Sequence, residues 1–273
     1  LIISSLVPLA LYSALRKKFP VAKAELLFFL SLIVFLSPYF RSSAVWLTTD
    51  NLALLFFLLS VNSFLKIDHS KNKIFKIFLF CFFFLILASY VRHYYSLFFL
   101  FYFVIIQSKL NLKENFYIIL FNFIFSIPVL IYFIYILKDK EPSHAFHFVG
   151  FDFIFNILIF SSLYFFYFIP FFFNKIGFQY SIKKFFLNKM QFLIIFLLIF
   201  LLFAFYDIPD LSFGGGVFYK ISKFFNLKIL LFFSLFGAFF LYVFNDIDKK
   251  NVLVYLILIF AFPLNTLFQK YYD

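Results

Sequence analysis

The sequence predicts an all-α fold, a polytopic bundle of transmembrane helices, on three observations. The 273-residue chain is 65% hydrophobic, only 13% of it is charged, and its apolar residues form long runs with a mean hydropathy of +1.03 overall. Soluble domains are about 45–50% apolar and about 25% charged, so a soluble enzyme is excluded. Nucleic-acid binding is excluded on the same grounds. A disulfide scaffold is excluded because Cys81 is the single cysteine.

The apolar runs predict about ten membrane spans in a single domain over residues 1–273. A helix needs about 20 apolar residues to cross the roughly 30 Å hydrocarbon core. The run 74–107 is too long for one crossing and carries Arg92 and His93 near its middle, so we interpret it as two short spans that meet at this polar pair. The runs in chain order are 1–15, 24–38, 51–65, 74–107, 115–137, 151–173, 190–205, 226–244 and 251–267.

Both ends of the chain interrupt apolar sequence. Leu1 lies inside a hydrophobic stretch, and Asp273 follows soon after another. We therefore expect a fragment of a longer protein, truncated at both ends, with a further span and a first extracytoplasmic loop upstream of Leu1.

The cations sort by side of the membrane. Cytoplasmic loops accumulate Lys and Arg, and one set of alternate loops holds 16 of the 24 cations. This set also holds five of the 12 carboxylates, which gives a net charge of about +11 inside and +1 outside. A single helix over 74–107 would move every later loop to the other side and would weaken this asymmetry. The hairpin is therefore favoured, and the basic excess needs no polyanionic partner. The inside cations are Arg16, Lys17, Lys18, Lys23, Lys66, Lys71, Lys73, Lys76, Lys109, Lys113, Lys175, Lys183, Lys184, Lys189, Lys249 and Lys250.

The outside face carries the candidate functional residues. Ionisable groups at membrane depth are costly unless paired or wetted, so they are candidates by default. Asp50 follows two threonines at the start of the third run, where capping of a helix N-terminus is an equally complete explanation. Arg92 and His93 lie between two spans, where snorkelling to the interface is the alternative.

A second group of candidates follows the run 115–137. Lys140, His144 and His147 share one outside loop. Two histidines three residues apart are a weak metal signal, and a plain interfacial loop explains them as well. We therefore assign no metal site. Gly214–Gly216 lacks the Lys-Ser/Thr of a phosphate loop and is interpreted as a flexible turn.

Four segments in order resemble one enzyme family. They are Pro38 to Asp50, with its Thr-Thr-Asp ending; Tyr90-Val-Arg-His-Tyr-Tyr95; Asp139-Lys140 with Ser143-His144 and His147-Phe148; and Pro263 to Tyr272. The chain resembles the dolichyl-phosphate-glucose α-1,2-glucosyltransferases, which add the terminal glucose to the lipid-linked oligosaccharide. That family belongs to the C-type membrane glycosyltransferases. In this chain, His93-Tyr94-Tyr95 stands where the glucosyltransferase family has Gln-Thr-Asn. The acidic Asp-Glu motif of that family is expected upstream of Leu1.

The resemblance implies a membrane hexosyltransferase. It would transfer a hexose, glucose or another, from a polyprenyl-phosphate or dolichyl-phosphate sugar to a glycan or lipid-linked acceptor, with inversion. Arg92 would hold the donor phosphate, with His93, Lys140, His144 and His147 as secondary phosphate contacts. The catalytic base is expected upstream, and Asp50 is a further candidate that would orient the acceptor or bind a divalent cation.

A transporter or flippase of a lipid-linked sugar is the competing class. The spacing of Pro128, Pro170 and Pro263 shows no internal repeat of the kind that transporters carry. The short loops and the composition favour a bacterial inner membrane over the endoplasmic reticulum, with the site on the extracytoplasmic side.

Overall fold

The computed structural model describes residues 2–36, 38–45, 49–67, 74–107, 109–131, 153–173, 189–208, 216–245 and 250–261, with residues 179, 183 and 210. Every element in these ranges is a helix, so the predicted all-α class is confirmed for the described part of the chain. The chain divides into two compact units, Leu1–Pro142 and Ser143–Asp273. The single domain over 1–273 stays a prediction.

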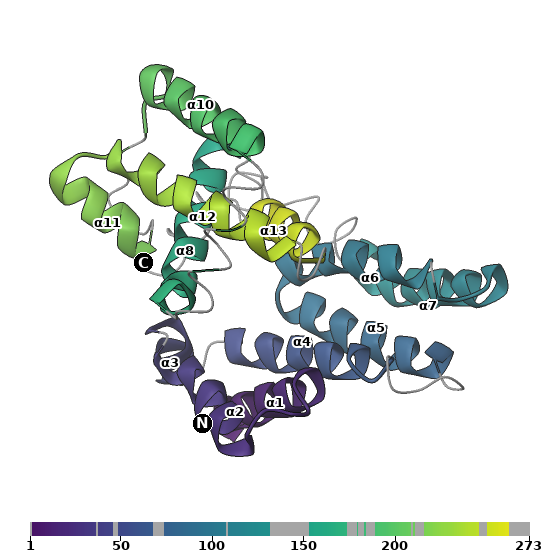
Figure 1. Ribbon diagram of the computed structural model, residues 1–273. Helices are drawn as coiled ribbons and strands as arrows, with labels where there is room; N and C mark the ends of the chain where they lie inside the picture. The colour runs from purple at the N-terminus through teal and green to yellow at the C-terminus, as the bar shows by residue number, and fades with distance from the viewer. Residues whose placement is uncertain are drawn as a thin grey trace. The chain divides into compact units, whose positions relative to one another are not determined.

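The described part of the first unit consists of helices (Figure 1), and all of them except α3 follow the predicted apolar runs. A pair of residues explains where its last helix starts. Asn111 Oδ1 accepts from the Glu114 N–H at 2.8 Å, and Glu114 Oε2 accepts from the Asn111 N–H at 3.3 Å, which is a capping box. The elements are α1 (Ile2–Lys18), α2 (Ala24–Leu32), η1 (Ile33–Leu36), α3 (Pro38–Val45), α4 (Asp50–Phe64), α5 (Ile74–Val91), η3 (His93–Leu97), α6 (Phe98–Ile106) and α7 (Leu112–Ile131).

The run 74–107 breaks at Arg92, as predicted. Arg92 has extended backbone angles, φ −142° and ψ 108°, which end α5 and let the chain turn into η3. Phe82 of α5 then contacts Phe99 and Phe103 of α6, at ring-centroid distances of 5.7 and 5.1 Å. The chain therefore folds back along α5 and does not continue as one long helix.

A buried hydroxyl network fixes this hairpin against α4. Ser60 Oγ lies 2.8 Å from the Cys81 carbonyl oxygen, to which it donates, and 3.1 Å from the Tyr102 hydroxyl. All three residues are buried. Because a hydroxyl removed from water costs free energy unless it is hydrogen-bonded, this network favours one register among α4, α5 and α6.

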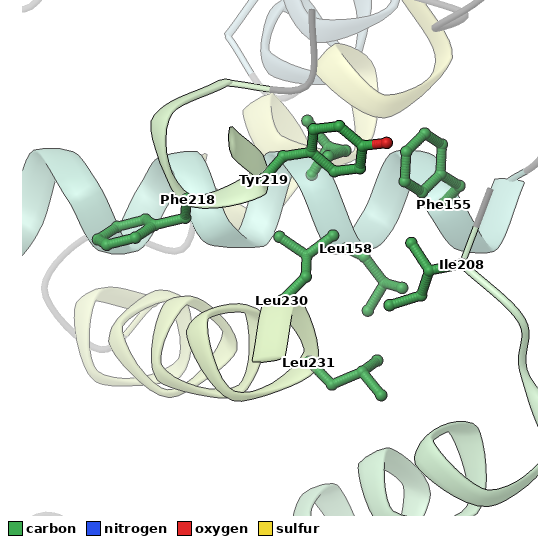
Figure 2. Packing of buried hydrophobic residues seen from close by; sticks show 8 residues of the cluster. Phe155, Leu158, Ile208, Phe218, Tyr219, Leu230 and Leu231 are labelled. Atoms are coloured by element: carbon green, nitrogen blue, oxygen red, sulfur yellow. The ribbon is translucent and has the colours of Figure 1, made fainter. Parts of the chain in front are cut away.

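The second unit is built around α8 and α12. Its core joins α8, α11, α12 and the segment that follows α10, and Figure 2 shows Phe155, Leu158, Ile208, Tyr219, Leu230 and Leu231 in it. Tyr219 meets Phe155 edge to face at a centroid distance of 5.8 Å. The elements are α8 (Phe153–Phe173), α10 (Lys189–Phe205), α11 (Gly216–Phe225), α12 (Ile229–Asn245) and α13 (Lys250–Ala261).

A glycine lets α8 and α12 cross closely. A Cβ atom added to Gly237 of α12 would lie 1.7 Å from the Ser161 carbonyl oxygen of α8. Near the crossing, Ser234 Oγ donates to the Leu158 carbonyl at 2.7 Å. The Ser161 hydroxyl lies 2.6 Å from that of Tyr255, which ties α13 to α8. Small and hydroxyl side chains are the residues that permit such helix contacts in a bilayer.

One described helix, α5 at Ile74–Val91, is long and apolar enough to cross a membrane by length and composition. Several other described helices are apolar but shorter, between 10 and 17 residues. The count of about ten spans is therefore not established by helix length, and it remains a prediction.

Two helices lie where the sequence predicted none. α3 occupies Pro38–Val45, and α11 begins at Gly216, the last residue of the triple glycine interpreted as a turn. Both are too short or too polar to form an apolar run. The pattern of apolar runs therefore does not predict these two helices.

We predict that Gly237→Ala lowers the free energy of unfolding by about 1–3 kcal/mol, because the added methyl group meets backbone and not a movable side chain. We expect this loss of stability although alanine has a higher helix propensity than glycine. Denaturation in detergent micelles, followed by circular dichroism, measures it.

Ala238→Ser is the matched control on the same helix, at a partly exposed position, and it should change stability little. Equal stability of Gly237→Ala and the parent would contradict the close crossing.

Candidate functional site

The structure joins two of the predicted site residues in one ion pair. Arg92 Nη2 donates to Asp50 Oδ2 at 2.9 Å, and Arg92 Nε lies 2.5 Å from Asp50 Oδ1. Two parallel contacts between a guanidinium and a carboxylate give geometric specificity as well as attraction. The sequence placed both residues on the outside face as separate candidates, and their contact was not predicted.

Asp50 is held by the way in which α4 starts. It is the first residue of α4, where a carboxylate interacts favourably with the helix dipole. The N-cap position is Thr49 and has no side-chain cap hydrogen bond, so capping by Asp50 stays a prediction. Its neighbour Asn51 is buried, and Asn51 Nδ2 donates to Ser4 Oγ at 2.9 Å and to the Phe40 carbonyl at 3.0 Å. These bonds attach the first turn of α4 to α1 and α3.

Arg92 is held by the break between α5 and η3. Its N–H still donates to the Ala88 carbonyl at 2.8 Å, and its carbonyl accepts from the Tyr95 N–H at 3.2 Å. The buried ring of Tyr95 lies against Phe57 of α4, with centroids 4.9 Å apart. Since η3 is thereby packed on α4, the Arg92 side chain lies within reach of Asp50.

The pair is partly exposed. The side chains of Arg92 and Asp50 are 24% and 20% exposed. A guanidinium has five N–H donors in a planar fork, and the contacts with Asp50 are made by its Nε/Nη2 edge. A guanidinium is also a group that binds anions such as phosphate.

A second polar cluster lies at the opposite end of α4. Buried Asn62 accepts from Lys17 Nζ at 2.6 Å and from Ser13 Oγ at 3.0 Å, and its amide donates to the Ala10 carbonyl at 2.7 Å. Burial, together with the nearby charge of Lys66, lowers the pKa of Lys17. Asn62 is 12 residues along the helix from Asp50, or about 18 Å at 1.5 Å per residue. The sequence analysis did not single out this cluster.

Of the other candidates, only His93 lies within the described residues. His93 is exposed on η3 and meets the ring of Tyr94 edge to face at 6.1 Å. Lys140, His144 and His147 lie outside the described residues. Within the part of the chain that the structure describes, no group of three or more His, Cys, Asp or Glu is arranged to hold a metal ion. A divalent cation therefore stays a prediction.

The comparisons with known proteins give no relative. No family model, no curated protein and no solved structure matches this chain. The family resemblance thus remains an expectation from short motifs.

We predict that Asp50 and Arg92 are energetically coupled. In a double-mutant cycle of Asp50→Asn and Arg92→Gln, the coupling should be about 1–3 kcal/mol, because a partly buried, two-point charged contact is lost in either single variant. Unfolding in detergent micelles provides the four free energies.

The matched control is the pair of Lys223 and Asp210, with nitrogen and oxygen 2.5 Å apart and side chains 41% and 64% exposed. Its cycle should show coupling indistinguishable from zero, since water screens exposed pairs. Equal coupling in the two cycles would argue against a structured Asp50–Arg92 contact.

Proposed function

We propose that this chain is the membrane part of a hexosyltransferase that uses a polyprenyl-phosphate sugar as donor. The observation that carries the proposal is the contact of Arg92 with Asp50, which places a guanidinium beside a carboxylate at the start of α4. Transfer of a sugar from a lipid phosphate needs both kinds of group. The donor's lipid tail would stay in the bilayer, which is why such a site belongs to a membrane protein.

The proposed topology is a polytopic bundle of about ten spans, with the site on the extracytoplasmic side of a bacterial inner membrane. Two findings support it. The fold-back of α6 along α5 agrees with two short spans in the run 74–107. The loop charges assign Asp50 and Arg92 to one side of the membrane and Lys17 and Lys66 to the other. In the structure these two groups lie at opposite ends of α4.

In the proposed reaction, the charged guanidinium of Arg92 binds the donor phosphate. Negative charge grows on the phosphate oxygen as the bond from this oxygen to the sugar C1 breaks, because the electron pair leaves with the phosphate. A guanidinium fixed beside that oxygen stabilises this charge without having to reorganise. Asp50 holds the fork in position through Nε and Nη2 before the donor arrives.

A carboxylate takes the proton of the acceptor hydroxyl as its oxygen bonds to C1 from the opposite face, so the anomeric centre inverts. The base proposed for this step is an acidic residue upstream of Leu1. Asp50 orients the acceptor in this scheme. Its negative charge also balances that of Arg92 when no donor is bound.

We predict that Arg92→Ala lowers the transfer rate by about 10²–10³-fold, the typical cost of removing one donor to a developing oxyanion. Arg92→Lys should retain part of the transfer rate, since a lysine keeps the charge but not the two-point contact. The assay measures transfer from a radiolabelled polyprenyl-phosphate sugar in membranes that contain the full-length protein.

Lys113→Ala, at an exposed position on α7, is the control and should transfer at the parent rate. Full activity of Arg92→Ala would overturn the phosphate assignment. Absence of transfer with every polyprenyl-phosphate sugar, together with movement of the donor across the membrane, would instead indicate a flippase.

We predict that Lys66→Cys and Lys113→Cys react with a membrane-impermeant maleimide from the same side, because two spans separate them in the hairpin topology. Lys220→Cys should react from the other side. Native Cys81 is buried, so it contributes little labelling. If Lys66→Cys and Lys113→Cys reacted from opposite sides, the run 74–107 would cross the membrane once.

A further inference from the structure

Helix α11, Gly216–Phe225, has three distinct faces. One face enters the core of the second unit: Phe218, Tyr219 and Ser222 are buried, and Figure 2 shows Phe218 and Tyr219 on α11 beside α8 and α12. At 100° per residue these three positions span about 100° of the helix circumference. The other two faces of α11 are exposed.

The second face is apolar. Phe224 is 83% exposed, Phe225 is 72% exposed and Ile221 is 39% exposed. Three large apolar side chains on one short helix form a patch that water solvates poorly. On the helical wheel this face borders the buried one on its Phe218 side.

The third face is basic. Lys220 and Lys223 are three residues apart and both exposed, so they lie on the same side of α11, between the apolar face and the Tyr219 side of the buried face. Lys223 forms an ion pair with Asp210, which raises the pKa of Lys223 by hydrogen bonding. Lys228 follows just after the helix. Lysines therefore outnumber carboxylates among these described neighbours.

We propose that α11 is an interfacial helix that lies in the surface of the bilayer and binds anionic phospholipid. Its apolar face enters the acyl region, and its lysines contact headgroup phosphates. An apolar face next to a Lys face on a helix of modest hydrophobicity is the pattern of interfacial helices. The helix is too short to cross a bilayer, and a fully buried position would leave two lysines without water.

The inference rests on the membrane location in the proposed function, and it is independent of sugar transfer. If it is correct, α11 fixes the depth of α12, whose start is linked to it through Asn226–Lys228. Phe218 and Phe233, on α11 and α12, have stacked rings with centroids 4.0 Å apart, so the two helices would move together.

The depth of α11 can be measured by tryptophan quenching. Trp46 is the single tryptophan of the chain, so Trp46→Phe provides a silent background. In the Trp46→Phe background, the fluorescence of Phe224→Trp should be quenched more by phosphatidylcholine brominated near the headgroup end of the acyl chain than by phosphatidylcholine brominated near the chain terminus. Phe236→Trp, at a 47% exposed site in the middle of α12, should show the reverse order.

The outcomes separate the two proposals. Quenching of Phe236→Trp without quenching of Phe224→Trp would overturn the interfacial helix and leave the membrane location intact. Quenching of neither would overturn the membrane location, and with it both proposals. Retained solubility in detergent and circular dichroism of each variant show that it is folded.

The anionic preference has its own readout. In mixed vesicles, brominated phosphatidylglycerol should quench Phe224→Trp more than brominated phosphatidylcholine does, with a lipid selectivity of about fivefold from one lysine contact. Lys220→Gln with Lys223→Gln should bring the selectivity to about one. Unchanged selectivity in that double variant would overturn the lysine contacts with phospholipid.

Discussion

The need to satisfy buried polar side chains determines the first unit. α4 carries Asn51, Ser60 and Asn62, all buried. Asn51 is hydrogen-bonded to α1 and α3, Ser60 to α5 and α6, and Asn62 to α1. Because apolar side chains gain little by leaving lipid for protein, such bonds and close packing are what select one arrangement in a membrane bundle. α4 is thereby fixed to α1 and α3 at its start and to α5 and α6 along its length.

The Asp50–Arg92 contact is a consequence of that arrangement. Asn51 attaches the start of α4 to α1 and α3, and Tyr95 packs η3 on α4, so the carboxylate and the guanidinium are brought together by their neighbours. The pair does not have to supply the energy that positions it. A charged pair that is already held can exchange contacts with a ligand at low cost in conformational entropy.

The sequence predicted the helices better than it predicted the site. Runs of apolar residues gave the position of nearly every long helix, and Arg92 correctly marked the break in 74–107, because a charge interrupts an apolar run visibly. α11 was missed because its signal is amphipathic and it lies behind a glycine run. The contact of Asp50 with Arg92 spans 42 residues and depends on how α4 and α5 pack, which one sequence does not show. That the two residues share a predicted face was the one signal available.

The helices of the second unit pack through a different set of contacts. Its central crossing uses Gly237 and short side chains, and Phe165 stacks on Phe218, Phe236 and Phe240. Aromatic and small-residue contacts of this kind place no charge in the helix interface. The described ion pair of this unit, Lys223 with Asp210, is at the surface, whereas the hydroxyl contacts of Ser161 with Tyr255 and of Ser234 with Leu158 are buried. In the described part of this unit, helix contacts therefore rely on close packing and hydroxyl groups.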